Sequence, residues 1–213
     1  MVGTYDVSRV LPVEEVDPGT NLLVAGPPMT GKRTLAFDLL EGGCTDGEAS
    51  VVVTTRESTD RLRNRYDCLE KGMEEGRTGI VDCVTRERGD SHVDSDTVRY
   101  VASPGDITDI GIRVGGLFQA VAEYGAVRTG LVSASTLLMY ADLRRVYRFL
   151  HVLTGKVQSH DWLGVTVVET SDVQALDALA PLFDGLVRTR ETDDGWQMRV
   201  VGLDRRPTDW VTY

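Results

Sequence analysis

Residues 21–34, NLLVAGPPMTGKRT, form the stretch around which the rest of the chain is organised. The apolar run 22–25 predicts a short buried strand, and the Gly- and Pro-rich run after it predicts a loop. A helix is expected next, because apolar residues recur at helical spacing. Its apolar positions are Leu35, Ala36, Leu39 and Leu40.

The loop fits the pattern G-x-x-x-x-G-K, which cradles phosphate groups in P-loop proteins. Gly26 and Gly31 let the backbone curl so that successive N–H groups point at one anion, and the helix adds its positive amino-terminal end. Lys32 places a charge where the β- and γ-phosphates of a nucleotide would lie. The predicted nucleotide-binding residues are Gly26, Pro27, Pro28, Met29, Thr30, Gly31, Lys32, Arg33 and Thr34.

The position after the lysine departs from this pattern. P-loop proteins carry Ser or Thr there, and its hydroxyl ligates Mg²⁺. This chain has Arg33, with Thr34 one place later. Arg33 could stand in for Mg²⁺, or it could reach into the phosphate site and block it, and the sequence leaves both readings open. A loop that no longer binds anything is the remaining alternative.

Charge and composition restrict the kind of protein. The chain of 213 residues is 41% hydrophobic, as expected of a globular protein, and it carries a formal net charge of −10. Such a charge disfavours general binding of nucleic acid, because the phosphates would be repelled. There are only three lysines, Lys32, Lys71 and Lys156, against 20 arginines. An Asp-rich, Lys-poor composition indicates a protein of a halophilic cytoplasm.

Membrane, metal and disulfide signals are weak. No apolar run approaches the ~20 residues of a membrane span, and the first residues do not read as a signal peptide, so we expect a cytoplasmic protein without a membrane partner. Cys44, Cys68 and Cys83 are an odd set without metal-ligand spacing, which predicts reduced thiols. The three histidines form no metal motif either, and no metal-ligating residue is predicted.

Strand-like and helix-like segments alternate along the chain, which predicts an α/β fold with a mostly parallel sheet. We expect one domain over 1–213, with a lead-in at 1–20 and a tail at 204–213. A hairpin, turning at residues 193–195, is predicted within 185–203. The other expected strands lie at 50–55, 79–84, 98–102, 130–134 and 163–168, and the expected helices follow near 59–73, 103–121, 143–157 and 173–183.

Several of these pieces together resemble the RecA/KaiC-like branch of P-loop ATPases. The resemblance rests on residues 18–28 (PGTNLLVAGPP), 99–106 (RYVASPGD), 135–140 (STLLMY) and the closing hairpin. More closely, the chain is similar to an uncharacterised haloarchaeal family of RecA-superfamily proteins (HTR-like) with a suggested role in signalling. The resemblance implies a three-layer sandwich around a twisted, mostly parallel sheet, with a C-terminal antiparallel hairpin and nucleotide at the carboxyl ends of the strands.

The catalytic parts of KaiC-like proteins match this chain poorly. Of the paired Glu residues that polarise the attacking water, the first position carries Arg56 and the second carries Glu57. The Asp that holds Mg²⁺ at the end of the Walker B strand corresponds to Val132. The Lys-x-Arg pair that reaches a neighbouring subunit corresponds to Gly202 and Asp204. The loss of that pair removes one reason to expect a ring, although a homo-oligomer stays open.

Three hypotheses follow. The first is a KaiC-like module that binds ATP or another nucleoside triphosphate, hydrolyses it slowly or not at all, and regulates or signals to an unidentified protein partner. The second is a working ATPase, in which Glu57 is the catalytic base and Thr34 helps to hold Mg²⁺. The third is a pseudo-P-loop scaffold for protein–protein interaction that binds no nucleotide. Whether the protein is an enzyme is left open.

Overall fold

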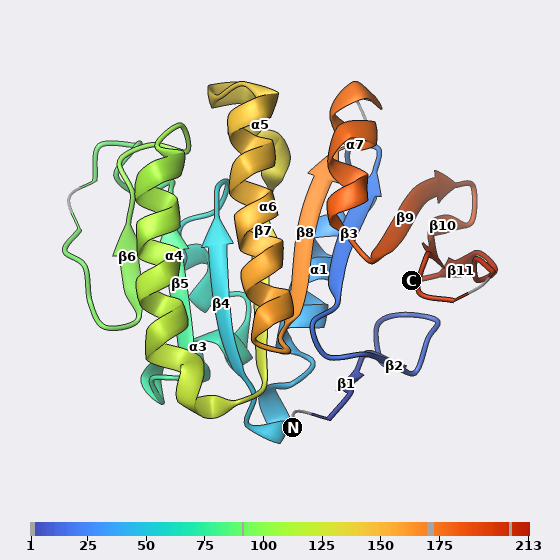
Figure 1. Cartoon of the computed structure of the whole chain (residues 1–213), viewed down its shortest axis with the longest axis horizontal. Helices are drawn as coiled ribbons and strands as arrows, with labels where there is room; N and C mark the ends of the chain where they lie inside the picture. Colours follow the sequence, from blue (N-terminus) through green and yellow to red (C-terminus); the bar gives the residue numbers. More distant parts are fainter. Residues whose placement is uncertain (1–2, 91, 170–172, 205) are drawn as a thin grey trace.

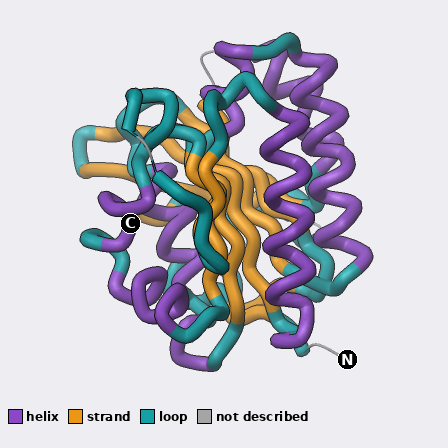
Figure 2. The backbone as a smooth tube through the Cα atoms, turned by 90° about the vertical axis from the view of Figure 1, so that its left-hand side faces the viewer, coloured by secondary structure: helices purple, strands orange, loops and turns teal. Residues whose placement is uncertain are grey.

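The computed structural model describes residues 3–90, 92–169, 173–204 and 206–213. Within them, nine strands form one sheet in the order β11-β10-β9-β3-β8-β7-β4-β5-β6. Helices cover both faces of this sheet, which gives three layers (Figures 1 and 2). The strands are β3 (Asn21–Gly26), β4 (Ala49–Thr54), β5 (Thr78–Asp82), β6 (Val98–Tyr100), β7 (Val127–Val132), β8 (Leu163–Glu169), β9 (Gly185–Thr192), β10 (Gly195–Val201) and β11 (Val211–Thr212).

The sheet is parallel from β9 through β3 to β6. Strand β10 is antiparallel to β9, and β11 is antiparallel to β10. The predicted α/β class, the mostly parallel sheet and the C-terminal antiparallel hairpin are therefore confirmed. The residues predicted as a tail add a third strand to this hairpin.

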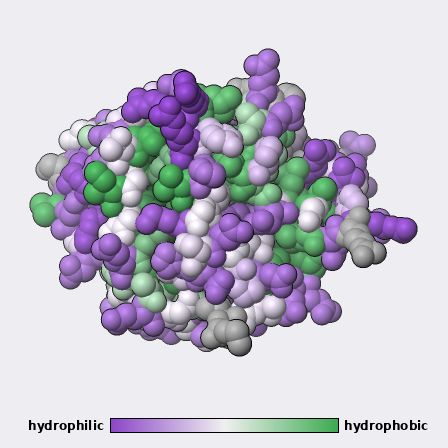
Figure 3. Space-filling view, viewed as in Figure 1, coloured by the Kyte–Doolittle hydropathy of each residue, from purple (hydrophilic) through white to green (hydrophobic). Residues whose placement is uncertain are grey.

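Seven helices of different lengths lie between the strands along the described part of the chain. They are α1 (Lys32–Glu41), α2 (Thr59–Arg63), α3 (Asp67–Glu74), α4 (Ile107–Val121), α5 (Ala134–Tyr140), α6 (Leu143–Ser159) and α7 (Val173–Leu179), with 3₁₀ turns at Cys44–Asp46, Ala122–Tyr124 and Ala180–Leu182. None of the helices in the described residues combines the length and the apolarity needed to cross a bilayer. The face that carries α4 and α6 mixes hydrophilic side chains with smaller hydrophobic areas (Figure 3).

The pleat of the strands divides the buried side chains between two cores. On β4, Val52 packs in the core that contains α1, whereas Val51 and Val53 pack in the core that contains α4 and α6. Because both faces of the central strands are buried, their sequences are apolar runs rather than alternating patterns. Such runs are what the sequence shows at 51–53 and 165–168.

Several predicted elements differ in extent from the structure, the helix α5 was not predicted, and two of the differences have a clear physical reason. The helix expected near 59–73 is divided into α2 and α3, because Tyr66 has an extended backbone and its ring stacks on Phe37 with centroids 4.3 Å apart. Strand β7 begins at Val127 rather than at residue 130, and so includes the polar Arg128. Its guanidinium is buried and is neutralised by Glu48 at 2.7 Å.

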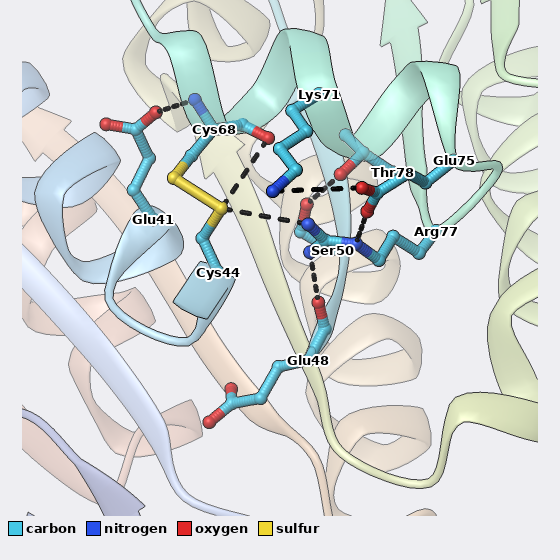
Figure 4. The surroundings of a disulfide bond; sticks show 9 residues. All are labelled: Glu41, Cys44, Glu48, Ser50, Cys68, Lys71, Glu75, Arg77 and Thr78. Atoms are coloured by element: carbon cyan, nitrogen blue, oxygen red, sulfur yellow. Dashed lines mark hydrogen bonds and ion pairs between the residues drawn. A yellow bond between two sulfur atoms is a disulfide. The ribbon is translucent and has the colours of Figure 1, made fainter. Parts of the chain in front are cut away.

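The prediction of reduced cysteines is wrong for two of the three. Cys44 and Cys68 form a disulfide with Cα atoms 5.9 Å apart, which joins the turn after α1 to the start of α3 (Figure 4). Arg77 lies beside it and donates a hydrogen bond to Cys44 Sγ at 3.8 Å. The two cysteines are 24 residues apart in sequence, and only the packing of α3 beside α1 brings them together. Cys83 is free and buried.

The lead-in segment forms a small separate pairing. Strand β1 (Tyr5–Asp6) pairs with β2 (Glu15–Val16) in a two-stranded antiparallel sheet. The Tyr5 side chain is buried, and its hydroxyl accepts a hydrogen bond from the Val127 N–H at 3.1 Å. The segment therefore packs against the amino end of β7.

Candidate functional site

A pocket of about 380 Å³ opens at the carboxyl ends of β3, β4, β7 and β8. In parallel α/β sheets this is the edge at which ligands bind. The loop between β3 and α1 forms its floor. The lining residues are Pro28, Met29, Thr30, Gly31, Lys32, Arg33, Thr34, Arg56, Glu57, Arg65, Tyr66, Ser133, Val167, Glu169 and Trp196.

The loop is held in one curled conformation. Gly31 has a φ of +67°, a value that glycine adopts without strain. Gly26 lies so close to β9 that a Cβ atom there would be 1.9 Å from the Thr189 hydroxyl. The buried Thr30 hydroxyl donates to the Pro27 carbonyl at 2.9 Å and lies 2.7 Å from the Thr189 hydroxyl. Both glycines of the motif are thus required by the geometry.

Lys32 is the first residue of α1 and is only 5% exposed. Its ammonium group donates a hydrogen bond to the Pro27 carbonyl. Burial lowers the pKa of Lys32, Arg33 and Arg56 lower it further, and the carboxylate of Glu169 opposes them. No ion pair between described residues involves Lys32, so an anion in the pocket would stabilise its charged form.

Three arginines surround the pocket, and each is paired with a carboxylate. Arg33 lies 3.0 Å and Arg65 3.4 Å from Glu57, which is 12% exposed, while Arg56 lies 3.0 Å from Glu169. With Lys32, the described lining residues therefore carry four cations and two anions. This local excess of positive charge stands out in a chain of net charge −10. It suits a ligand with several negative charges.

The residues present do not fit the usual Mg²⁺ site of a P-loop protein. Val132, at the position of the Walker B acid, is buried in the core on the α1 side of the sheet. Arg33 points to Glu57 from the position of the usual hydroxyl ligand, and Thr34 is exposed at the pocket rim. Among the described residues, no group of three or more His, Cys, Asp or Glu side chains is arranged to hold a metal ion.

The predicted site residues are therefore only partly brought together. Residues 28–34 of the loop and Glu57 line the pocket, whereas Gly26 and Pro27 lie below it and support the loop. Glu57 is tied to two arginines, so its carboxylate is already occupied by Arg33 and Arg65.

Sequence reasoning missed Glu169, Arg65, Tyr66 and Trp196. Glu169 ends β8, beside Gly26 of β3, and an acidic residue directly after a predicted strand was a signal that could have found it. The other three had no comparable signal. Arg65 and Tyr66 enter the pocket because the helix breaks between α2 and α3, and Trp196 enters because the hairpin returns to the loop.

Comparisons with known proteins agree with this architecture. A model of the "Family of unknown function (DUF7504)" matches residues 19–189. A UPF0273 protein of Aeropyrum pernix is 28% identical over 164 residues, which are 73% of this chain and 61% of that relative. The chain thus spans less than two thirds of that relative's length.

A solved structure has the same fold. The crystal structure of a KaiC-like protein from the hyperthermophilic archaeon Pyrococcus horikoshii OT3 superposes with a TM-score of 0.66 at 16% identity. The match covers 97% of this chain and 89% of that one. The fold is therefore that of this KaiC-like protein, and the chain belongs to the family of unknown function DUF7504.

Proposed function

We propose that this protein binds a nucleoside triphosphate at residues 26–34 without needing Mg²⁺, hydrolyses it slowly or not at all, and acts as a regulatory module. The observation that carries the proposal is the charge of the pocket. Lys32 and three arginines face the space in which phosphates would lie, and the usual metal ligands are replaced by Arg33 and Val132.

Weak hydrolysis follows from the same replacements. Phosphoryl transfer depends on positioning the attacking water and on neutralising charge at the phosphates. Arginines can neutralise the phosphates, but a water needs a free acceptor. Glu57 accepts from two guanidinium groups and Glu169 from one, but each carboxylate keeps further acceptor sites, so the weak hydrolysis that we propose rests on the replaced Mg²⁺ ligands and not on these ion pairs.

Regulation would act through the segment after β4. A triphosphate that attracts Arg33 and Arg65 competes with Glu57 for both cations. Arg65 lies in the connection between α2 and α3. The Glu57 backbone is tied to the end of β4, because its carbonyl accepts a hydrogen bond from the Thr54 hydroxyl at 2.6 Å. Ligand binding therefore favours a different position of α2 and α3, and this shift would present a surface to a protein partner in a halophilic cytoplasm.

Binding is tested by calorimetry with ATP and ADP in concentrated KCl. Lys32→Met removes the charge but keeps the length of the side chain. Lys71→Met, which changes a lysine with a 67% exposed side chain on α3, is the matched control. We expect wild type and Lys71→Met to bind ATP alike, and Lys32→Met to bind at least about tenfold more weakly. Absence of binding in all three would refute the proposal and leave the scaffold hypothesis.

The ATPase hypothesis remains the second candidate, because two carboxylates, Glu57 and Glu169, line the pocket. It requires Mg²⁺-dependent turnover that Glu57→Ala abolishes. Turnover that survives this substitution would exclude Glu57 as the base.

A further inference from the structure

The two ends of the pocket differ in chemistry, and the order of the strands separates them. Arg56 and Glu57 follow β4, Ser133 follows β7 and Glu169 ends β8, so the charged end lies on the β4 side of the loop. Trp196 belongs to β10, on the opposite side of β3 (Figure 1). The pocket thus runs from a cluster of charges, across the loop, to an indole ring.

Trp196 offers an open ring surface at this second end. It is 41% exposed, whereas Tyr66, the other aromatic residue of the lining, is 6% exposed and is stacked on Phe37. An exposed tryptophan beside a charged pocket is an unusual use of a large apolar side chain. Flat aromatic ligands such as nucleobases stack on rings of this kind.

The loop and the C-terminus restrict Trp196, through contacts of its ring and of its backbone. The edge of the indole packs on Gly31, where a Cβ atom would come within 2.7 Å of the ring. The Trp196 carbonyl accepts a hydrogen bond from the Tyr213 N–H at 3.2 Å, and the Tyr213 hydroxyl donates to the Thr30 carbonyl of the loop. A ring that is already ordered loses little entropy when a base stacks on it.

We propose that Trp196 is the platform for the base of the bound nucleotide, with the triphosphate extending over the loop toward Arg33, Arg56 and Arg65. This inference rests on the proposed function and adds the class of ligand. The ligand is a nucleotide with an aromatic base, not a free polyphosphate. The packing of the indole on the loop also explains the glycine at 31, since a side chain there would displace the ring.

The test compares ATP with inorganic tripolyphosphate, which has the same phosphate chain but no base. Affinities are measured by calorimetry in KCl with EDTA on wild type, Trp196→Ala, Trp196→Phe and the control Trp210→Phe. Trp210 is not a lining residue, and its ring lies against Arg190 with the guanidinium carbon 4.0 Å from the ring centroid. We expect Trp196→Ala to weaken ATP binding at least about tenfold, with tripolyphosphate binding changed less than about twofold.

Trp196→Phe keeps a ring and should retain most of the affinity for ATP, and Trp210→Phe should behave as wild type. ATP, but not tripolyphosphate, should quench the tryptophan fluorescence, and Trp196→Phe should abolish the quenching. If Trp196→Ala lowered the affinities for ATP and for tripolyphosphate equally, the inference would be overturned, because the ring would then only support the loop. Unchanged ATP binding would overturn it as well. Wild type that binds neither ligand would instead refute the proposed function itself.

Discussion

Replacement of Glu57 by Gln distinguishes between two roles: binding of phosphate by the arginines, and catalysis by the carboxylate. Glu57 is 12% exposed and holds Arg33 at 3.0 Å and Arg65 at 3.4 Å. Glutamine has the same shape and can still accept hydrogen bonds, but it carries no charge. In Glu57→Gln both guanidinium groups are therefore available to an incoming anion.

The size of the effect follows from the two ion pairs. Arg33 is partly exposed and Arg65 is exposed, and a pair of this kind contributes up to about 1 kcal/mol. A triphosphate that displaces Glu57 from both must overcome about 1–2 kcal/mol. Removing the carboxylate removes this cost, so we expect ATP to bind Glu57→Gln about 5- to 30-fold more tightly. Salt screens such pairs, and the gain should fall as KCl is raised.

The assay is calorimetric titration of ATP in EDTA, together with phosphate release in Mg²⁺. Glu70→Gln is the control, because it removes a carboxylate that pairs with Arg63 on α2, outside the pocket lining. Its affinity for ATP should equal that of wild type. Unchanged or weaker binding by Glu57→Gln, combined with loss of Mg²⁺-dependent phosphate release, would refute our reasoning and identify Glu57 as a catalytic base.

Three further predictions concern stability, measured by denaturant unfolding. Arg128→Met should lower the free energy of unfolding by about 3 kcal/mol, because it leaves a carboxylate and two carbonyls without their buried donor. Arg63→Met, which removes a partly exposed ion pair, should change the free energy of unfolding by less than about 1 kcal/mol. Breaking the Cys44–Cys68 bridge by Cys68→Ser should cost about 3 kcal/mol, as expected for a 24-residue separation, and the difference from wild type should vanish in reductant. Lys32 has a pKa below its usual 10.5, so the unfolded state binds more protons between the two pKa values, and stability should rise with pH in that interval. Lys32→Met should therefore be more stable than wild type at neutral pH and should lack this part of the rise.

The fold was accessible from the sequence because its strands are apolar runs separated by helical patterns. Residues 51–53 and 165–168 read directly as buried parallel strands. Polar residues that are neutralised by distant partners gave no such signal. The beginning of β7 was not predicted, because it contains the polar Arg128. The buried ion pair that neutralises Arg128 is made with Glu48, 80 positions away in sequence.

The candidate site was predicted only where it is local in sequence. The loop and Lys32 were located by the spacing of a short motif, and Glu57 was located by the resemblance to the paired Glu of KaiC-like proteins. Trp196 and Arg65 approach the loop through the return of the hairpin and the break between α2 and α3. These contacts arise from tertiary packing, as does the disulfide, and no spacing rule predicts them.

The central claim is that arginines take the place of the metal at this loop, and the most direct test is the affinity of wild type for ATP with and without Mg²⁺. Calorimetry in concentrated KCl would compare the affinity for ATP in about 5 mM EDTA with the affinity in about 5 mM MgCl₂. We predict equal affinities within about threefold and tighter binding of ATP than of ADP, because the proposed mode of binding brings the terminal phosphate to Arg33 and Arg65, which line the pocket. Binding that requires Mg²⁺ would contradict the claim.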